Sequence, residues 1–212
     1  MDVDSQHVWQ VVHAERSRLV DDLRRVPRDA WSTPSLCPGW TVHDVLAHLL
    51  DTAKTSRIDF IRRMIAARFD FDGDNDIGIA REKRDDPAAT LTAMQDAVPL
   101  TKTPPAPRAT RLVEAFVHGE DIRRPLGIAT DYPLDAVAAA LMHQSKTTVA
   151  IGGGRERVAG LRLVATDSGF ALGDGIAVTG RAIDLLLAAS GRPLPDGSLD
   201  GPGAARLTAS AG

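Results

Sequence analysis

Cysteine is almost absent from this sequence, since the 212 residues include one, Cys37. A disulfide within the chain is therefore excluded, which fits a reducing compartment. Long apolar runs are also missing, because none approaches the roughly 18 to 20 residues needed to span a bilayer. The first ten residues, MDVDSQHVWQ, are acidic and lack the basic region and apolar core of a signal peptide. We therefore expect a cytoplasmic protein.

A strong excess of charge of either sign is lacking as well. The net charge of -3 provides no electrostatic basis for binding nucleic acid or an anionic membrane surface. What the chain does have is the composition of a globular protein, with 43% apolar and 25% charged residues. Its length allows one large domain or two small ones with a real hydrophobic core.

Helical periodicity dominates the first 150 residues. Apolar residues at helical spacing, with charges between them, predict helices within residues 5–26, 41–69, 85–98, 109–126 and 134–151. Thr41 followed by Asp44 at the third helical position is close to a capping box. Asp86 followed by Pro87 is typical of a helix start.

The pattern changes after the glycines at 152–154. Residues 158–167 and 169–180 cluster branched apolar side chains between glycines, which predicts short strands and a hairpin. Residues 180–192 read as one apolar helix. We therefore predict a four-helix-type bundle in residues 1–150 and a small α+β domain in residues 155–212, with the glycine run as their boundary.

Two predicted helices carry residues that can bind a metal. Glu114 and His118 are four residues apart, so their side chains leave the same helix face and can reach one divalent cation. On the helix predicted at 41–69, His48 shares a polar arc with Asp44 and Thr52, opposite several leucines. Periodicity alone does not distinguish a polar pocket between the helices from two stripes that face solvent.

The segments WSTPSLCPGWTVHDVLAHL and EAFVHGEDIRRPLG together resemble the mycothiol-dependent maleylpyruvate isomerase family. Residues 161–192 resemble the small second domain of that family. The resemblance implies a DinB-like metal-binding bundle, with His48, Glu114 and His118 as ligands of zinc or another divalent metal such as nickel. It also implies mycothiol as cosubstrate, so the partners would be a small-molecule thiol and a small-molecule substrate.

That ligand set is chemically reasonable for catalysis. Two imidazoles and one carboxylate leave a zinc coordination position open for water or substrate. A metal held in this way lowers the pKa of a bound thiol or polarises a carbonyl oxygen. We expect Asp44, one turn before His48, and Asp121, beside His118, to orient the ligand imidazoles.

Several other signals have simpler interpretations. Arg123 is a candidate for binding an anionic substrate, although a solvated cation at a helix end explains it equally well. We expect Cys37 and Trp40 to be structural residues of the loop before the second helix. Residues 70–78, DFDGDNDIG, begin like a calcium loop but lack its glycine and its final glutamate, so we expect a mobile acidic loop.

We therefore expect a mycothiol-dependent isomerase or S-transferase, whose substrate and catalytic residues the sequence does not identify. Two alternatives remain open. One is a metal-dependent hydrolase or other detoxifying enzyme that uses metal-bound water. The other is a non-catalytic, metal-binding regulatory protein that keeps the bundle.

Overall fold

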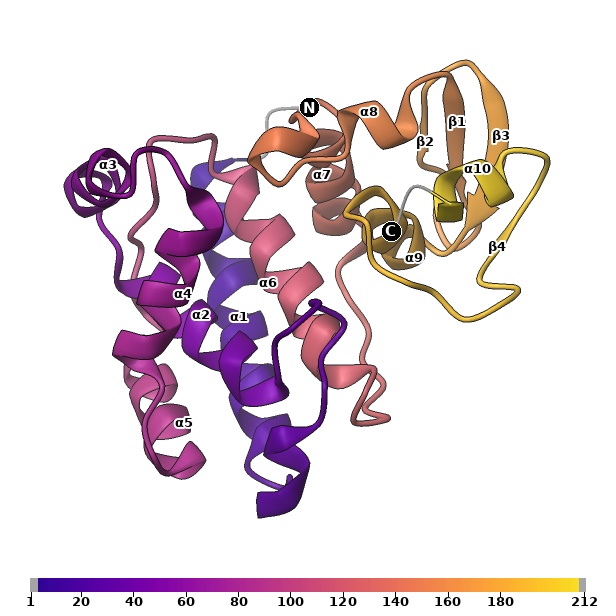
Figure 1. Ribbon diagram of the computed structural model, residues 1–212. Coiled ribbons are helices and arrows are strands. Elements are labelled where there is room, and N and C mark those ends of the chain that lie inside the picture. The colour runs from indigo at the N-terminus through magenta and orange to yellow at the C-terminus, as the bar shows by residue number, and fades with distance from the viewer. Residues whose placement is uncertain (1–3, 210–212) are drawn as a thin grey trace. The chain divides into compact units, whose positions relative to one another are not determined.

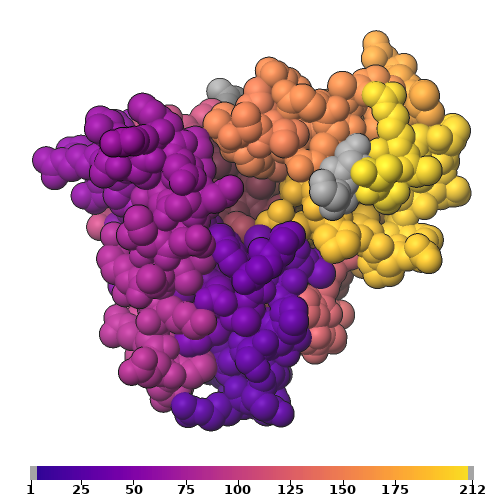
Figure 2. All heavy atoms as spheres, in the orientation of Figure 1, coloured from indigo at the N-terminus to yellow at the C-terminus, as the bar shows by residue number. Residues whose placement is uncertain are grey.

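The computed structural model describes residues 4–209 and divides the chain into two compact units. The first unit comprises residues 4–129, and the second begins at Thr130. Figure 1 traces the helices and strands, and Figure 2 shows the heavy atoms in the same colours by residue number. No helix in residues 4–209 is both long enough and apolar enough to cross a membrane.

The first unit is a helical bundle, as predicted. Its elements are α1 (Ser5–Leu23), the 3-10 helix η1 (Arg28–Ser32), α2 (Val42–Lys54), α3 (Arg57–Ala66), α4 (Phe71–Glu82), α5 (Pro87–Ala97) and α6 (Ala109–Arg123). Helix α2 packs against α4, α5 and α6, and α1 packs against α5 and α6. Helices α4 and α5 both pack against α2 and together take the place of one long helix. With α1, α2 and α6, they arrange the unit as a four-helix bundle (Figure 1).

Apolar side chains of four helices, α1, α2, α5 and α6, form the core of this unit. Its buried side chains include Leu19, Leu23, Val45, Leu46, Leu49, Leu50, Met94 and Ile122. The helix starts predicted from the sequence are present. Thr41 and Asp44 form a reciprocal capping box on α2, and Asp86 caps α5 with Pro87 in its first turn.

The single helix predicted over residues 41–69 is wrong, because the chain breaks it after Lys54. Thr55 is extended, and Ser56 starts α3 with a capping box of its own. The Ser56 hydroxyl accepts a hydrogen bond from the Asp59 backbone N–H at 3.2 Å, and the Asp59 carboxylate accepts one from the Ser56 N–H at 3.3 Å. The same motif that opened α2 therefore opens α3, which stands out from the bundle (Figure 1).

The mobile loop expected at residues 70–78 is also wrong, because this segment forms most of α4. Asp70 caps the helix by accepting a hydrogen bond from the Gly73 N–H at 3.1 Å. Acidic residues in the first turn favour this helix end through the helix dipole. Gly78 lets α4 approach α2 closely, since a Cβ there would lie 2.5 Å from an Asp51 carboxylate oxygen.

The second unit combines a small sheet with helices. It contains α7 (Leu134–Gln144), η2 (Val149–Ile151), α8 (Arg155–Val158), β1 (Leu161–Ala165), β2 (Ala171–Leu172), β3 (Ile176–Gly180), α9 (Ala182–Ala189), β4 (Leu199–Asp200) and α10 (Ala204–Ala209). The strand order is β2-β1-β3-β4, with β1 and β3 parallel and the two edge strands antiparallel. The apolar helix predicted at 180–192 corresponds to α9, whose residues are all buried.

The boundary between the units lies before α7 and not at the glycine run. Helix α7 packs against α9, so it belongs with the sheet rather than with the bundle. Gly153 and Gly154 are buried inside the second unit, so the run does not form a linker. A Cβ at Gly154 would lie 2.2 Å from the backbone oxygen of Ala189.

Candidate metal centre

The contact between α2 and α6 brings two histidines together. The ring centroids of His48 and His118 lie 4.8 Å apart, and the rings are nearly perpendicular. The Trp40 ring packs on both imidazoles, with centroid distances of 5.1 Å to His48 and 6.5 Å to His118. Trp40 therefore covers the pair as well as anchoring its loop.

His48 is a buried, neutral imidazole. Burial lowers its pKa well below the ordinary value, and the nearby positive charges of His118 and Arg111 lower it further. Its Nδ1 atom is buried and has no hydrogen-bond partner within residues 4–209. Such an orphaned nitrogen is costly in a protein interior, and coordination to a cation would satisfy it.

His118 is oriented by a buried carboxylate. Its Nδ1 lies 2.9 Å from Oδ2 of Asp121, whose side chain is fully buried. Burial lowers the pKa of His118, but the hydrogen bonds to Asp121 and Cys37 outweigh this and raise the pKa to about 9. At neutral pH the imidazole therefore carries a proton that a metal has to replace. A role for Asp121 in orienting a metal ligand stays a prediction.

Glu114 lies one helical turn before His118 but is engaged elsewhere. Arg111 contacts both carboxylate oxygens, with Nη1 at 3.0 Å from Oε1 and Nη2 at 2.8 Å from Oε2. The Thr52 hydroxyl donates to Oε1 at 2.7 Å. Oε1 thus accepts two hydrogen bonds, whereas Oε2 has the one contact with Arg111, so the second lone pair of Oε2 can bind a metal while these contacts hold the carboxylate in place.

Cys37, expected from the sequence to be a structural loop residue, lies beside His118 and Asp121. Its Sγ lies 3.4 Å from Oδ2 of Asp121. Within the described part of the chain, the metal-binding side chains whose ligand atoms lie within 4.8 Å of one another are those of Cys37, His118 and Asp121. Cys37 and Asp121 are 84 residues apart in sequence, so only the folded bundle shows that they meet.

Two of the candidate site residues make their contacts within the bundle. Asp44 does not contact His48, because its carboxylate accepts hydrogen bonds from the Thr41 backbone and hydroxyl and from Lys83 Nζ at 2.7 Å. Arg123 is fully buried. It pairs with Glu15 and, at 2.8 Å, with Asp22, which ties α6 to α1 and leaves it no access to a substrate.

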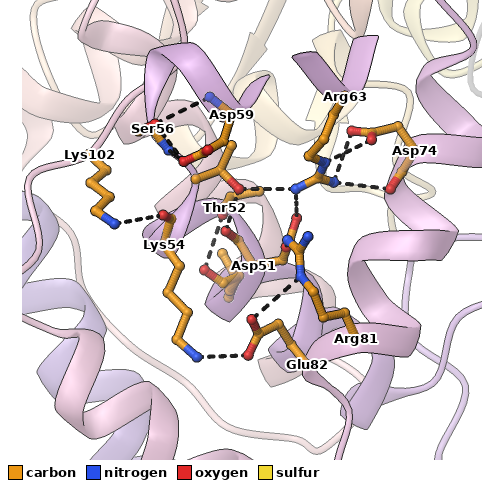
Figure 3. Close-up of polar contacts among 12 residues, drawn as sticks. Asp51, Thr52, Lys54, Ser56, Asp59, Arg63, Asp74, Arg81, Glu82 and Lys102 are labelled. Carbon is orange, nitrogen blue, oxygen red and sulfur yellow. Dashed lines mark hydrogen bonds and ion pairs between the residues drawn. The ribbon is translucent and has the colours of Figure 1, made fainter. Parts of the chain in front are cut away.

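A charged network adjoins the Glu114 end of the site. Figure 3 shows Arg63 of α3 between Asp51 of α2 and Asp74 of α4, at 2.8 Å from each carboxylate. A small cavity of about 60 Å³ borders this network, and its lining includes Thr52 and Arg111. The network positions α3 and α4 on α2, and its members are scattered over too much sequence to be recognised as a motif.

Comparison with known proteins places the chain in a family. Residues 12–123, more than half of the sequence, match the family model described as mycothiol maleylpyruvate isomerase N-terminal domain. The chain belongs to this family. No curated protein matches it. The matched residues of the mycothiol maleylpyruvate isomerase N-terminal domain include His48, Glu114 and His118, together with Cys37 and Asp121.

Two solved structures share the fold over nearly the whole chain. They are the crystal structure of the mycothiol-dependent maleylpyruvate isomerase, at 19% identity, and a histidine-to-alanine mutant of it, at 18% identity. For both, the TM-score is 0.62, and the alignment covers 95% of this chain and 94% of the other. The helical bundle and the small second domain expected from the sequence are thus also the fold of these two structures.

The residues present fit a divalent metal. Imidazole, carboxylate and thiolate are the side chains that zinc binds in proteins. The neutral, unpaired His48 beside His118 supplies two such donors within a covered part of the bundle. Asp121 on Nδ1 of His118 is the carboxylate–histidine arrangement that commonly fixes a ligand imidazole.

Proposed function

We propose that this protein is a metal-dependent enzyme that uses a small-molecule thiol, mycothiol, in an isomerisation or S-transfer reaction. The observation that carries the proposal is the pairing of His48 with His118 across α2 and α6 in a chain of this family. His48, Glu114 and His118 would hold one divalent metal, zinc or nickel. When bound, the metal would supply a positive charge that favours the thiolate form of the cosubstrate.

The protein's own residues would prepare this site in three ways. Asp121 holds the imidazole of His118 in one orientation. Arg111 and Thr52 hold the Glu114 carboxylate, so that little side-chain freedom remains to be lost when it binds. Trp40 packs on both imidazoles and would shield a metal there from water, which strengthens electrostatic interactions beneath it.

Calorimetry with mycothiol tests the proposal. The thiol should bind the metal-loaded protein and titrate well below the usual value of about 8.5, because a divalent cation stabilises the thiolate over the thiol. Binding should therefore release a proton, which titrations in buffers of different ionisation enthalpy detect. A His48→Ala variant should lose the proton release, and a His143→Ala variant, altered on α7 of the other unit, should keep it.

Equally tight mycothiol binding by the His48→Ala variant, with no proton released, would contradict the proposal. A metal-dependent hydrolase would then be the better interpretation if the wild-type protein still holds a metal. A non-catalytic regulatory protein would be the better interpretation if the protein binds a metal but shows no enzymatic turnover.

A further inference from the structure

We propose that Cys37 is a sulfur ligand of the metal bound at His118, at the coordination position that a small-molecule thiol would otherwise take. The inference rests on the metal site proposed above and adds a ligand to it. It would make the resting site a mixed sulfur, nitrogen and oxygen centre. An incoming thiol would then compete with the protein's own cysteine.

The backbone fixes the place of Cys37 against α6. The Leu36 N–H donates to the backbone oxygen of Asp121 at 3.2 Å, which ties the loop to the helix one residue before the cysteine. The Cys37 N–H donates to the Ser35 hydroxyl at 3.1 Å, and the Cys37 carbonyl accepts from the Trp40 N–H at 3.1 Å. These hydrogen bonds of the loop therefore hold the Cys37 thiol beside α6.

The distances suit a shared cation. With Zn–S near 2.3 Å and Zn–N or Zn–O near 2.0 Å, two donors on one tetrahedral zinc lie about 3 to 4 Å apart. The ligand atoms of Cys37 and His118 lie within 4.8 Å of each other, and the Asp121 carboxylate that orients His118 lies 3.4 Å from the Cys37 sulfur. A small movement of side chains would bring the sulfur into the coordination shell of a metal bound to His118.

A second observation points to a ligand at the same place. His48 is 7% exposed, and its buried Nδ1 has no partner in the described structure, although its ring lies against His118. The carboxylate of Glu114, in contrast, already accepts hydrogen bonds on Oε1 and an ion pair on Oε2. A sulfur donor would complete the shell of a metal at the histidines without breaking the Arg111–Glu114 pair.

The chemistry of the thiolate agrees with this position. Cysteine sulfur is a soft donor that selects zinc over hard cations such as magnesium. Cys37 is the only cysteine of the chain, so a test of the sulfur ligand has no competing protein thiol. Any protein thiolate bound to a metal in this molecule must come from it.

Cobalt substitution tests the inference directly. Untagged protein would be loaded with Co²⁺ in the presence of a phosphine reductant, so that no added thiol or histidine tag binds the metal. Wild-type protein should show a thiolate-to-cobalt charge-transfer band in the near ultraviolet, and Cys37→Ser protein should lack it. The serine variant should also bind Co²⁺ more weakly. Loss of a residue that only orients a ligand typically lowers metal affinity by about 10–100-fold, and we expect loss of a ligand to lower it by at least as much.

Alkylation of the wild-type protein gives a second readout that needs no variant. Zinc should slow the reaction of Cys37 with iodoacetamide, followed by mass spectrometry, because a coordinated thiolate is shielded from the reagent. His143→Ala serves as the control and should retain both the band and the protection.

The outcomes separate this inference from the proposed function. Wild-type protein that binds one Co²⁺ per chain without the band, with unchanged alkylation and with equal affinity in Cys37→Ser, would overturn the sulfur ligand and leave the metal site standing. Wild-type protein that binds no metal would overturn both.

Discussion

At the scale of single residues, we expect Asp121 to orient His118 toward a metal. It is fully buried and accepts the hydrogen bond from Nδ1 of that ring. An Asp121→Asn variant keeps the shape but removes the charge, so we expect metal affinity to fall by about 10–100-fold. Competition with a coloured chelator measures this. An Asp96→Asn variant, altered at an exposed position on α5, is the matched control, and equal affinity in both would contradict the role.

His43 is a second buried imidazole, and its titration belongs to the fold rather than to the site. Its Nε2 lies 2.9 Å from the Thr90 hydroxyl. Burial lowers its pKa, and Lys83 adds to this, while Asp44 and Asp86 oppose it. Because the folded pKa lies below the unfolded value of about 6.5, the unfolded chain takes up the proton first as the pH falls. Stability is therefore lost below about pH 6.5.

Denaturant unfolding in the presence of a chelator tests this sign. Wild-type protein should lose free energy of unfolding between about pH 7 and pH 5.5. A His43→Gln variant, which can keep a hydrogen bond to Thr90, should lose less over the same range. Parallel pH dependence in the two proteins would show that His43 does not carry the effect.

At the scale of elements, the close approach of α4 to α2 depends on Gly78. Alanine is favoured over glycine inside a helix by about 1 kcal/mol, yet its Cβ would press on Asp51, which Arg63 and Arg81 hold. We expect Gly78→Ala to destabilise the protein by about 1–3 kcal/mol, measured by denaturant unfolding. Gly73→Ala meets only the end of the exposed Asp70 side chain and should be tolerated. Equal stability of the two variants would argue against the close contact.

The same elements show what local sequence can predict. The starts of α2 and α5 follow from side chains within three residues of the cap, and both were predicted correctly. Helix α4 was missed because its acidic, glycine-containing sequence has little intrinsic helix preference. Its packing on α2 and the pairing of Asp74 with Arg63 stabilise it, and these contacts come from other helices.

At the scale of the whole molecule, the position of α7 sets where the chain can be divided. Ala136, Val137, Ala140 and Leu141 are buried in α7, which packs on α9 of the second unit. A fragment of residues 1–129 should therefore be a soluble helical protein that still binds metal. A fragment of residues 1–150 exposes the apolar face of α7 and should aggregate more. Light scattering would measure the aggregation of the two fragments, and circular dichroism their helix content. A longer fragment that aggregates less than the shorter one would favour a domain boundary at the glycine run.

The candidate site was only partly predictable from sequence for a related reason. The motif resemblance named His48 and His118, and the bundle places their rings together. The buried pair of Glu15 and Arg123 joins residues 108 apart in sequence, so the sequence could not show that Arg123, a candidate for binding an anionic substrate or a solvated helix end, pairs with α1. Likewise, no local pattern links Cys37 to α6.

Metal analysis of untagged protein tests the central claim most directly. After loading with zinc and gel filtration, wild-type protein and His143→Ala should each carry about one metal ion per chain. His48→Ala and His118→Ala should carry almost none, while keeping most of their helical circular dichroism. Wild-type protein free of metal, or full metal content in both site variants, would contradict the claim that these two histidines form a metal centre.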